Sequence, residues 1–133
     1  MKLVLDTHAL VWWVSSPGEL SRKAARALEK ALNDEALVFA SSVSIWEIGM
    51  LMRKGRLALP ASLSDWVRTV EAIPLLRFEP VGNSVAVDSV QLPDFTHPDP
   101  ADRLIVATAR ALDATLITKD QVLRRYRHVR SLW

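Results

Sequence analysis

Four acidic residues stand at positions where a carboxylate is costly unless something compensates its charge. Asp6 directly follows the apolar run LVL, and Asp120 follows the apolar run TLIT by one residue. Glu47 is the only charge in SIWEIGMLM, and Asp102 lies where the apolar pattern of DRLIVATARAL begins. A buried carboxylate requires a partner, a proton or a metal ion. Acids gathered at one place favour a hard divalent cation, such as Mg²⁺ or Mn²⁺.

The segment HPDPADRLIVATARAL also has a purely structural interpretation. An aspartate followed by a proline and then an acidic residue in the first turn is a good start for a helix. The carboxylates of Asp99 and Asp102 would both favour the positive end of the helix dipole. Capping and metal binding therefore both remain open for these two residues at this point.

The other acids have structural alternatives as well. Asp6 and Asp120 could each cap a following helix. Glu47 could form a capping box with Ser44 or an ion pair with Arg53. Because the residues around Glu47 are apolar on every side of a helix, the pattern predicts that this helix is buried.

The rest of the chain predicts short apolar strands that alternate with amphipathic helices. This alternation is typical of a three-layer α/β/α sandwich with a mainly parallel sheet. The predicted strands are 2–6, 36–41, 75–81, 115–118 and 129–133, and the predicted helices are 19–35, 42–55, 63–73, 83–92, 100–113 and 120–126, with another beginning near Thr7.

In such a sheet, binding sites form beyond the carboxyl ends of the strands. Asp6 and Asp120 would stand at two of these ends. Glu47 lies one to two turns into the helix after a third strand, and Asp102 lies in the first turn of its own helix. The four acids therefore come from segments far apart in sequence and can meet at one edge of the sheet.

Length and composition set wider limits. A chain of 133 residues is consistent with a single domain, spanning 1–133, with a sizeable core. It has no cysteine, which excludes disulfides and thiolate metal sites. No uncharged apolar run approaches the roughly 18 residues of a membrane span, and no signal peptide is evident, so we expect a soluble, cytoplasmic protein. The net charge is only +2, but residues 103–133 carry seven basic and two acidic residues, a patch that could face phosphate.

Several motifs of the chain together resemble the PIN-domain endoribonucleases, and most closely the VapC-type toxins of VapBC toxin–antitoxin pairs. The motifs are LDTHALVWW, SSVSIWEIG followed by KGRLALP, HPDPADRLIVATA and LITKD, and they span nearly the whole chain. The resemblance implies that Asp6, Glu47, Asp102 and Asp120 are the catalytic and metal-binding quartet, whereas Asp99 caps its helix. It also implies Mg²⁺- or Mn²⁺-dependent hydrolysis of RNA by a metal-activated water, a cognate antitoxin partner and a homodimer.

Some further roles follow from this hypothesis. Thr118, two residues before Asp120, could hold a metal-bound water. Arg103 and the arginines of 124–130 are candidate phosphate contacts, and His8 and His97 stand close in sequence to acids of the quartet. Tryptophans could line an apolar groove for the antitoxin or a dimer face, although most of them are expected in the core: Trp12, Trp13 and Trp46.

Two other classes of function remain as alternatives. The first is a catalytically silent PIN-like module that binds RNA or protein, which a complete acidic quartet argues against. The second is a phospho-receiver domain, which needs an aspartate at the end of a central strand with paired acids and a lysine nearby. The middle strand here ends RFEP instead.

Overall fold

The computed structural model describes residues 1–133 and contains one five-stranded sheet in which all neighbouring strands are parallel. The strand order is β3-β2-β1-β4-β5, so the first strand lies at the centre. In register, Leu3 stands beside Val38 on one side and Thr115 on the other. The strands are β1 (Leu3–Leu5), β2 (Val38–Ser41), β3 (Leu76–Glu79), β4 (Thr115–Ile117) and β5 (Arg130–Leu132).

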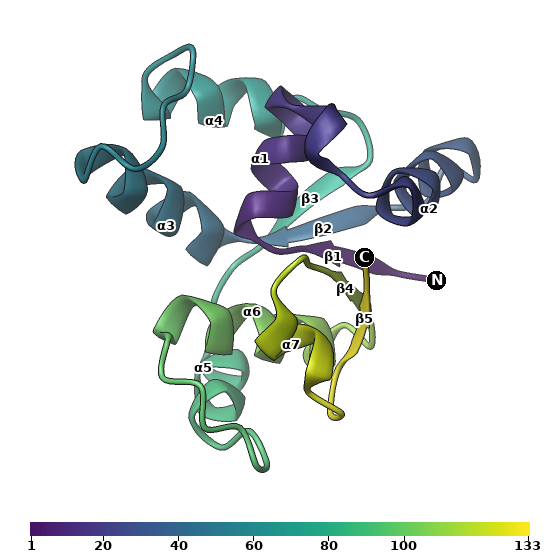
Figure 1. The fold of residues 1–133 in the computed structure, drawn as a ribbon, viewed down its shortest axis with the longest axis vertical. Coiled ribbons are helices and arrows are strands. Elements are labelled where there is room, and N and C mark those ends of the chain that lie inside the picture. Colours follow the sequence, from purple (N-terminus) through teal and green to yellow (C-terminus); the bar gives the residue numbers. More distant parts are fainter.

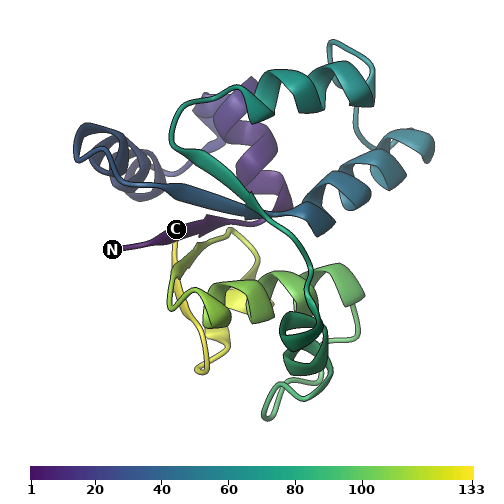
Figure 2. The same ribbon diagram turned by 180° about the vertical axis from the view of Figure 1, so that it is seen from behind.

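Seven α-helices cover the two faces of this sheet, which gives the predicted three-layer sandwich. Helices α1, α3 and α4 lie above the sheet in Figure 1, and α5, α6 and α7 lie below it. Seen from behind, the chain passes from β3 in the upper part of the molecule to α5 in the lower part (Figure 2). The helices are α1 (Thr7–Ser15), α2 (Arg22–Asn33), α3 (Ser42–Arg53), α4 (Leu63–Glu71), α5 (Asn83–Val90), α6 (Pro100–Ala111) and α7 (Gln121–Arg125).

Each face of the sheet has its own hydrophobic core, because successive strand residues point to opposite faces. On β1, Leu3 and Leu5 pack against α1, α2, α3 and α4, whereas Val4 packs against α6 and α7. All three residues are almost completely buried. The near-continuous apolar strands thus reflect a sheet covered on both sides, as predicted.

The helix boundaries follow local capping chemistry. Ser21 caps α2, so the helix begins at Arg22, and Pro17–Glu19, the segment just before it, forms a short 3₁₀ turn. Gly55 adopts a φ of 68° just after α3, a left-handed conformation that favours glycine and ends helices. The long helix predicted over 19–35 is therefore three residues shorter at its start.

The strand order changes direction beside β1. The chain builds β2 and β3 on one side of β1, then crosses to place β4 and β5 on its other side. In open α/β sheets, a crevice forms beyond the carboxyl ends of the strands at this switch point. Asp6 follows β1 and Asp120 follows β4, so both lie at this crevice.

None of the helices is long and apolar enough to cross a membrane.

Candidate active site

A cavity of about 520 Å³ opens at the carboxyl ends of β1 and β4. Five of its lining residues are acidic, and they come from α3, from the turns after β1 and β4, and from the start of α6. The cavity therefore collects acids from segments far apart in the sequence. Its lining residues are Asp6, Thr7, His8, Trp12, Glu47, Leu51, Arg56, Asp99, Asp102, Lys119 and Asp120.

Asp6 is the most deeply buried of the acids, with 8% of its surface exposed. Its Oδ1 accepts a hydrogen bond from the backbone N–H of Ala9 at 2.8 Å and caps α1. Its Oδ2 accepts a short hydrogen bond from the Thr118 hydroxyl. Burial raises the pKa of Asp6, and these two hydrogen bonds only partly oppose that effect. Capping was one alternative for Asp6, and the structure shows that it caps the helix while also lining the cavity.

Thr118 connects the two strand ends. Its hydroxyl donates to Asp6 and accepts the backbone N–H of Asp120 at 3.1 Å. The side chain is fully buried. Thr118 therefore has a structural role, because its only proton is donated to the Asp6 carboxylate, and its contact with a metal-bound water stays a prediction. Its position fixes Asp6 relative to Asp120.

Asp120 is half-buried and caps α7. Its Oδ1 accepts the backbone N–H groups of Val122 at 2.8 Å and Leu123 at 3.4 Å. Its Oδ2 has no hydrogen-bond partner within the protein. One carboxylate oxygen thus orients the side chain while the other remains free at the cavity.

Asp102 lies in the first turn of α6 and is held from two sides. The Asp99 carboxylate accepts its backbone N–H at 2.9 Å, which confirms Asp99 as the cap of α6. His97 Nε2 lies 2.7 Å from its Oδ2. Burial is the largest cause of the raised pKa of Asp102, and the neighbouring carboxylates add to it, whereas the His97 contact lowers it; the net result is a pKa of about 6 in place of the usual 3.8. Asp102 is thus an acid that is costly to ionise without a cation nearby.

Glu47 lines the cavity with the other acids, as predicted, but its helix is less buried than expected. Only Ser44 and Ile48 of α3 are fully buried, so the expectation of a buried helix is wrong, and Glu47 itself is half-buried. The helix is exposed on one side because no other element covers it there. Ser41 rather than Ser44 caps α3, and Glu47 makes no ion pair with Arg53. Neither structural alternative for Glu47 is therefore present.

The acids form two overlapping groups whose ligand atoms lie within 4.8 Å of one another. One group contains Glu47, Asp99 and Asp102, and the other contains His97, Asp102 and Asp120. Asp102 belongs to both, whereas Asp6 lines the same cavity but belongs to neither. The resemblance implies only that Asp99 caps its helix; the structure shows that Asp99 caps α6 and also lies in one of the two groups.

Arg103 has a structural role instead of the predicted contact with phosphate. Its guanidinium donates to four backbone carbonyls of residues 89–97, at 2.7 to 3.3 Å. One of these carbonyls belongs to His97, whose ring contacts Asp102. Arg103 therefore fixes the loop that brings His97 to the acids. Nothing in the sequence indicated which backbone groups it would bind.

The C-terminal arginines lie outside the cavity. Arg130 pairs with Asp113 at 2.9 Å, and Arg127 lies 3.6 Å from Asp94. Arg124 and Arg125 are exposed and make no ion pair. These side chains do not contribute to the acidic site itself.

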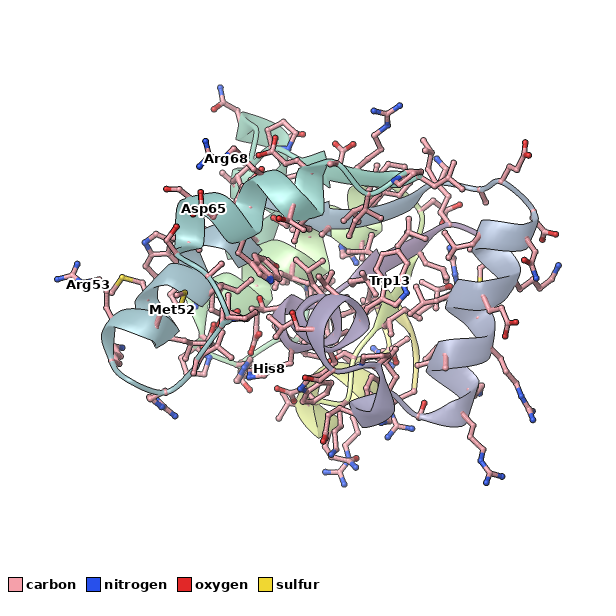
Figure 3. The ribbon with its side chains drawn as sticks, turned by 90° about the horizontal axis from the view of Figure 1, so that it is seen from above. His8, Trp13, Met52, Arg53, Asp65 and Arg68 are labelled. Carbon is pink, nitrogen blue, oxygen red and sulfur yellow. The ribbon has the colours of Figure 1, made fainter.

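The tryptophans are less buried than predicted. Trp12 and Trp13 are half-buried and Trp46 is 58% exposed. Trp13 packs against the core on the α1 side of the sheet, and Trp12 lines the acidic cavity. Figure 3 shows Trp13 and His8 on the face that carries α1, α3 and α4.

Comparisons with known proteins agree with this fold. The PIN domain family matches residues 3–129. The chain is 38% identical over 129 residues to Ribonuclease VapC22 of Mycobacterium tuberculosis, and the match covers 96% of this chain and 94% of that protein.

Solved structures of low sequence identity share the same fold. VapBC2 from Rickettsia felis, bound to a DNA fragment from its promoter, matches with a TM-score of 0.72 and 16% identity, covering 100% of this chain and 99% of that one. FitAB bound to the IR36 DNA fragment matches with a TM-score of 0.67 and 21% identity, covering 98% and 93%. Because the family match and the 38% identical relative each span almost the entire sequence, this chain belongs to the PIN-domain family, among the VapC-type ribonucleases.

Proposed function

We propose that this protein is a Mg²⁺- or Mn²⁺-dependent endoribonuclease and the toxin of a type II toxin–antitoxin pair. The observation that carries the proposal is the single cavity that gathers Asp6, Glu47, Asp102 and Asp120 at the switch point of the sheet. The kinship with a VapC ribonuclease supports the same activity.

The residues of the cavity fit a hard divalent cation. An oxygen of Asp102 lies within 4.8 Å of carboxylate oxygens of Glu47 and Asp99 in one group and of Asp120 in the other. Oxygen atoms are the ligands that hard divalent cations prefer. Burial and mutual repulsion raise the pKa of Asp102, and a nearby cation would remove that cost. Asp120 keeps an oxygen without a protein partner. We infer that Asp102, Asp120 and Glu47 would hold the ion, and that Asp6 would contribute through the lone pairs its hydrogen bonds leave free.

Side chains around the cavity would position the carboxylates that hold the cation. When bound, the cation would activate a water for attack on phosphorus and offset charge on the phosphate. The hydrogen bonds of Thr118 fix the position of Asp6 relative to the turn at Asp120. His97 orients the Asp102 carboxylate, and Arg103 in turn fixes the backbone of His97. Such preorganisation keeps the carboxylates in place before the cation and the RNA arrive.

The test is cleavage of end-labelled single-stranded RNA by the purified chain in Mg²⁺, Mn²⁺ or EDTA. We expect cleavage with either ion, none in EDTA, and a loss of at least 100-fold in Asp102→Asn, in line with the several kcal/mol that a metal contributes. Asp34→Asn is the matched control, since Asp34 lies on an exposed helix end with only Lys30 as its partner. RNA binding without cleavage in any metal would favour the catalytically silent module.

An apolar groove between α3 and α4 is a candidate docking site for an antitoxin partner. This cavity of about 510 Å³ is mostly hydrophobic and is lined by Trp46, the most exposed tryptophan of the three discussed. Figure 3 shows Met52 and Arg53 where α3 ends, beside α4 with its surface pair Asp65 and Arg68. We propose that an apolar segment of the cognate antitoxin docks here. Co-purification of the two proteins, lost in Trp46→Ala, tests this site. Homodimer formation stays a prediction, to be tested by sedimentation.

A further inference from the structure

The acidic cavity is also lined by an aromatic ring and by basic groups. The Trp12 ring is half-buried, and its centroid lies 5.6 Å from that of the exposed His8 ring. Lys119 Nζ lies 5.7 Å from the Trp12 centroid, within the range of a cation–π contact. The centroid of the Trp133 ring also lies 5.7 Å from that of Trp12. Trp12 is therefore a braced ring that remains partly open at the cavity.

Two basic residues of this cavity form no ion pair with its acids. Lys119 is adjacent in sequence to Asp120, yet it makes no ion pair and no hydrogen bond. Arg56, in the segment after α3, also lines the cavity without an acidic partner. Both side chains are exposed. Lys119, which contacts the Trp12 ring, and Arg56 therefore line the cavity beside five carboxylates without forming an ion pair with any of them.

An aromatic ring with basic side chains beside it suits the binding of a single nucleic-acid strand. Single-stranded nucleic acids bind where an aromatic ring accepts a stacked base and nearby cations contact the backbone phosphates. A duplex presents no free base face to such a ring. Cations beside the carboxylates also offset the repulsion that a polyanion would meet at an acidic cavity.

We propose that Trp12, Lys119 and Arg56 form the binding track for a single strand of RNA across the acidic cavity. A nucleobase stacks on Trp12, and Lys119 and Arg56 contact phosphates on either side of the scissile position. This inference rests on the proposed ribonuclease function and assigns the substrate contacts to these residues in place of Arg103 and the C-terminal arginines.

Binding is measured by fluorescence anisotropy with a labelled, unstructured RNA 8-mer, in Mg²⁺ and over a series of salt concentrations. All variants are built on Asp102→Asn, so that the RNA stays intact and the result does not depend on cleavage. We expect Trp12→Leu to weaken binding about fivefold or more with an unchanged salt dependence, because it removes stacking and no charge. We expect Lys119→Gln and Arg56→Gln each to reduce the slope of log affinity against log salt by about 0.7, as for one phosphate contact on a single strand.

Two controls separate this track from general effects. Lys23→Gln removes one exposed positive charge from α2, far from the cavity lining, and should leave the slope unchanged. Trp12→Phe keeps an aromatic face and should retain most of the affinity, which guards against a folding defect in Trp12→Leu. The proposal is overturned if Lys119→Gln behaves like Lys23→Gln, or if Trp12→Leu binds RNA as the parent does. If the wild type cleaves RNA in that case, the ribonuclease function stands and only the track is wrong.

Discussion

Asp102→Asn is expected to stabilise the metal-free protein at neutral pH, although it removes a central side chain of the site. Burial and nearby carboxylates raise the pKa of Asp102 to about 6 from its usual 3.8. Since one pKa unit corresponds to about 1.4 kcal/mol, the ionised carboxylate costs the folded state about 3 kcal/mol. Asparagine removes the charge, and its oxygen can still accept a hydrogen bond from His97 Nε2.

The sign of the pH dependence follows from the direction of this shift. Because the pKa is higher in the folded than in the unfolded protein, the stabilising contribution of Asp102 is complete below about pH 4 and is lost as pH rises through 6. Asp102→Asn has no carboxyl group at this position, so its stability does not fall in this way as pH rises. Its advantage over the wild type should therefore be near zero at pH 4 and reach about 3 kcal/mol above pH 7. Asp6, whose pKa is also raised by burial, affects both proteins alike.

Urea unfolding in EDTA between pH 4 and 8 measures this difference directly. Asp34→Asn, an exposed acid outside the site, should show no comparable gain. Excess Mg²⁺ should stabilise the wild type and leave Asp102→Asn nearly unaffected, because a ligand stabilises only the state that binds it. The reasoning is refuted if Asp102→Asn is less stable than the wild type at pH 7.5, or if the gap persists unchanged at pH 4.

Three further changes probe the surroundings of the site. Thr118→Val removes the donor to buried Asp6 and should cost about 1–3 kcal/mol in urea unfolding, whereas Thr118→Ser should retain most of the stability. Arg103→Met frees four carbonyls and should cost about 3 kcal/mol, with faster hydrogen exchange confined at first to residues 89–97; unchanged exchange there would contradict its clamping role. Trp46→Ala should change stability by less than about 0.5 kcal/mol but weaken antitoxin binding at least tenfold by calorimetry, and equal binding would exclude the α3–α4 groove.

The fold was largely predictable because its signals are local. Short apolar strands flanked by capped helices define a parallel α/β sheet, and the switch in strand order then places the ends of β1 and β4 together. The positions of Asp6 and Asp120 follow from this logic alone. Both also cap helices, so the structural and the functional interpretations of these residues are compatible rather than competing.

What could not be predicted depends on packing between distant segments. The exposure of α3 depends on which other helices and strands pack against it, and an apolar sequence does not show this. The roles of Thr118 and Arg103 depend on partners up to 112 residues away in the chain, or on individual backbone carbonyls. The membership of His97 in an acidic group likewise requires a loop conformation that only the structure provides.

The central claim is that the carboxylates of this cavity form one site for a divalent cation. Calorimetric titration of Mn²⁺ into the wild type, Asp102→Asn and Asp34→Asn at pH 7.5 tests it most directly. We predict that the wild type and Asp34→Asn bind with the same affinity and that Asp102→Asn binds at least tenfold more weakly. Equal binding in all three proteins, or no binding in any, would contradict the account.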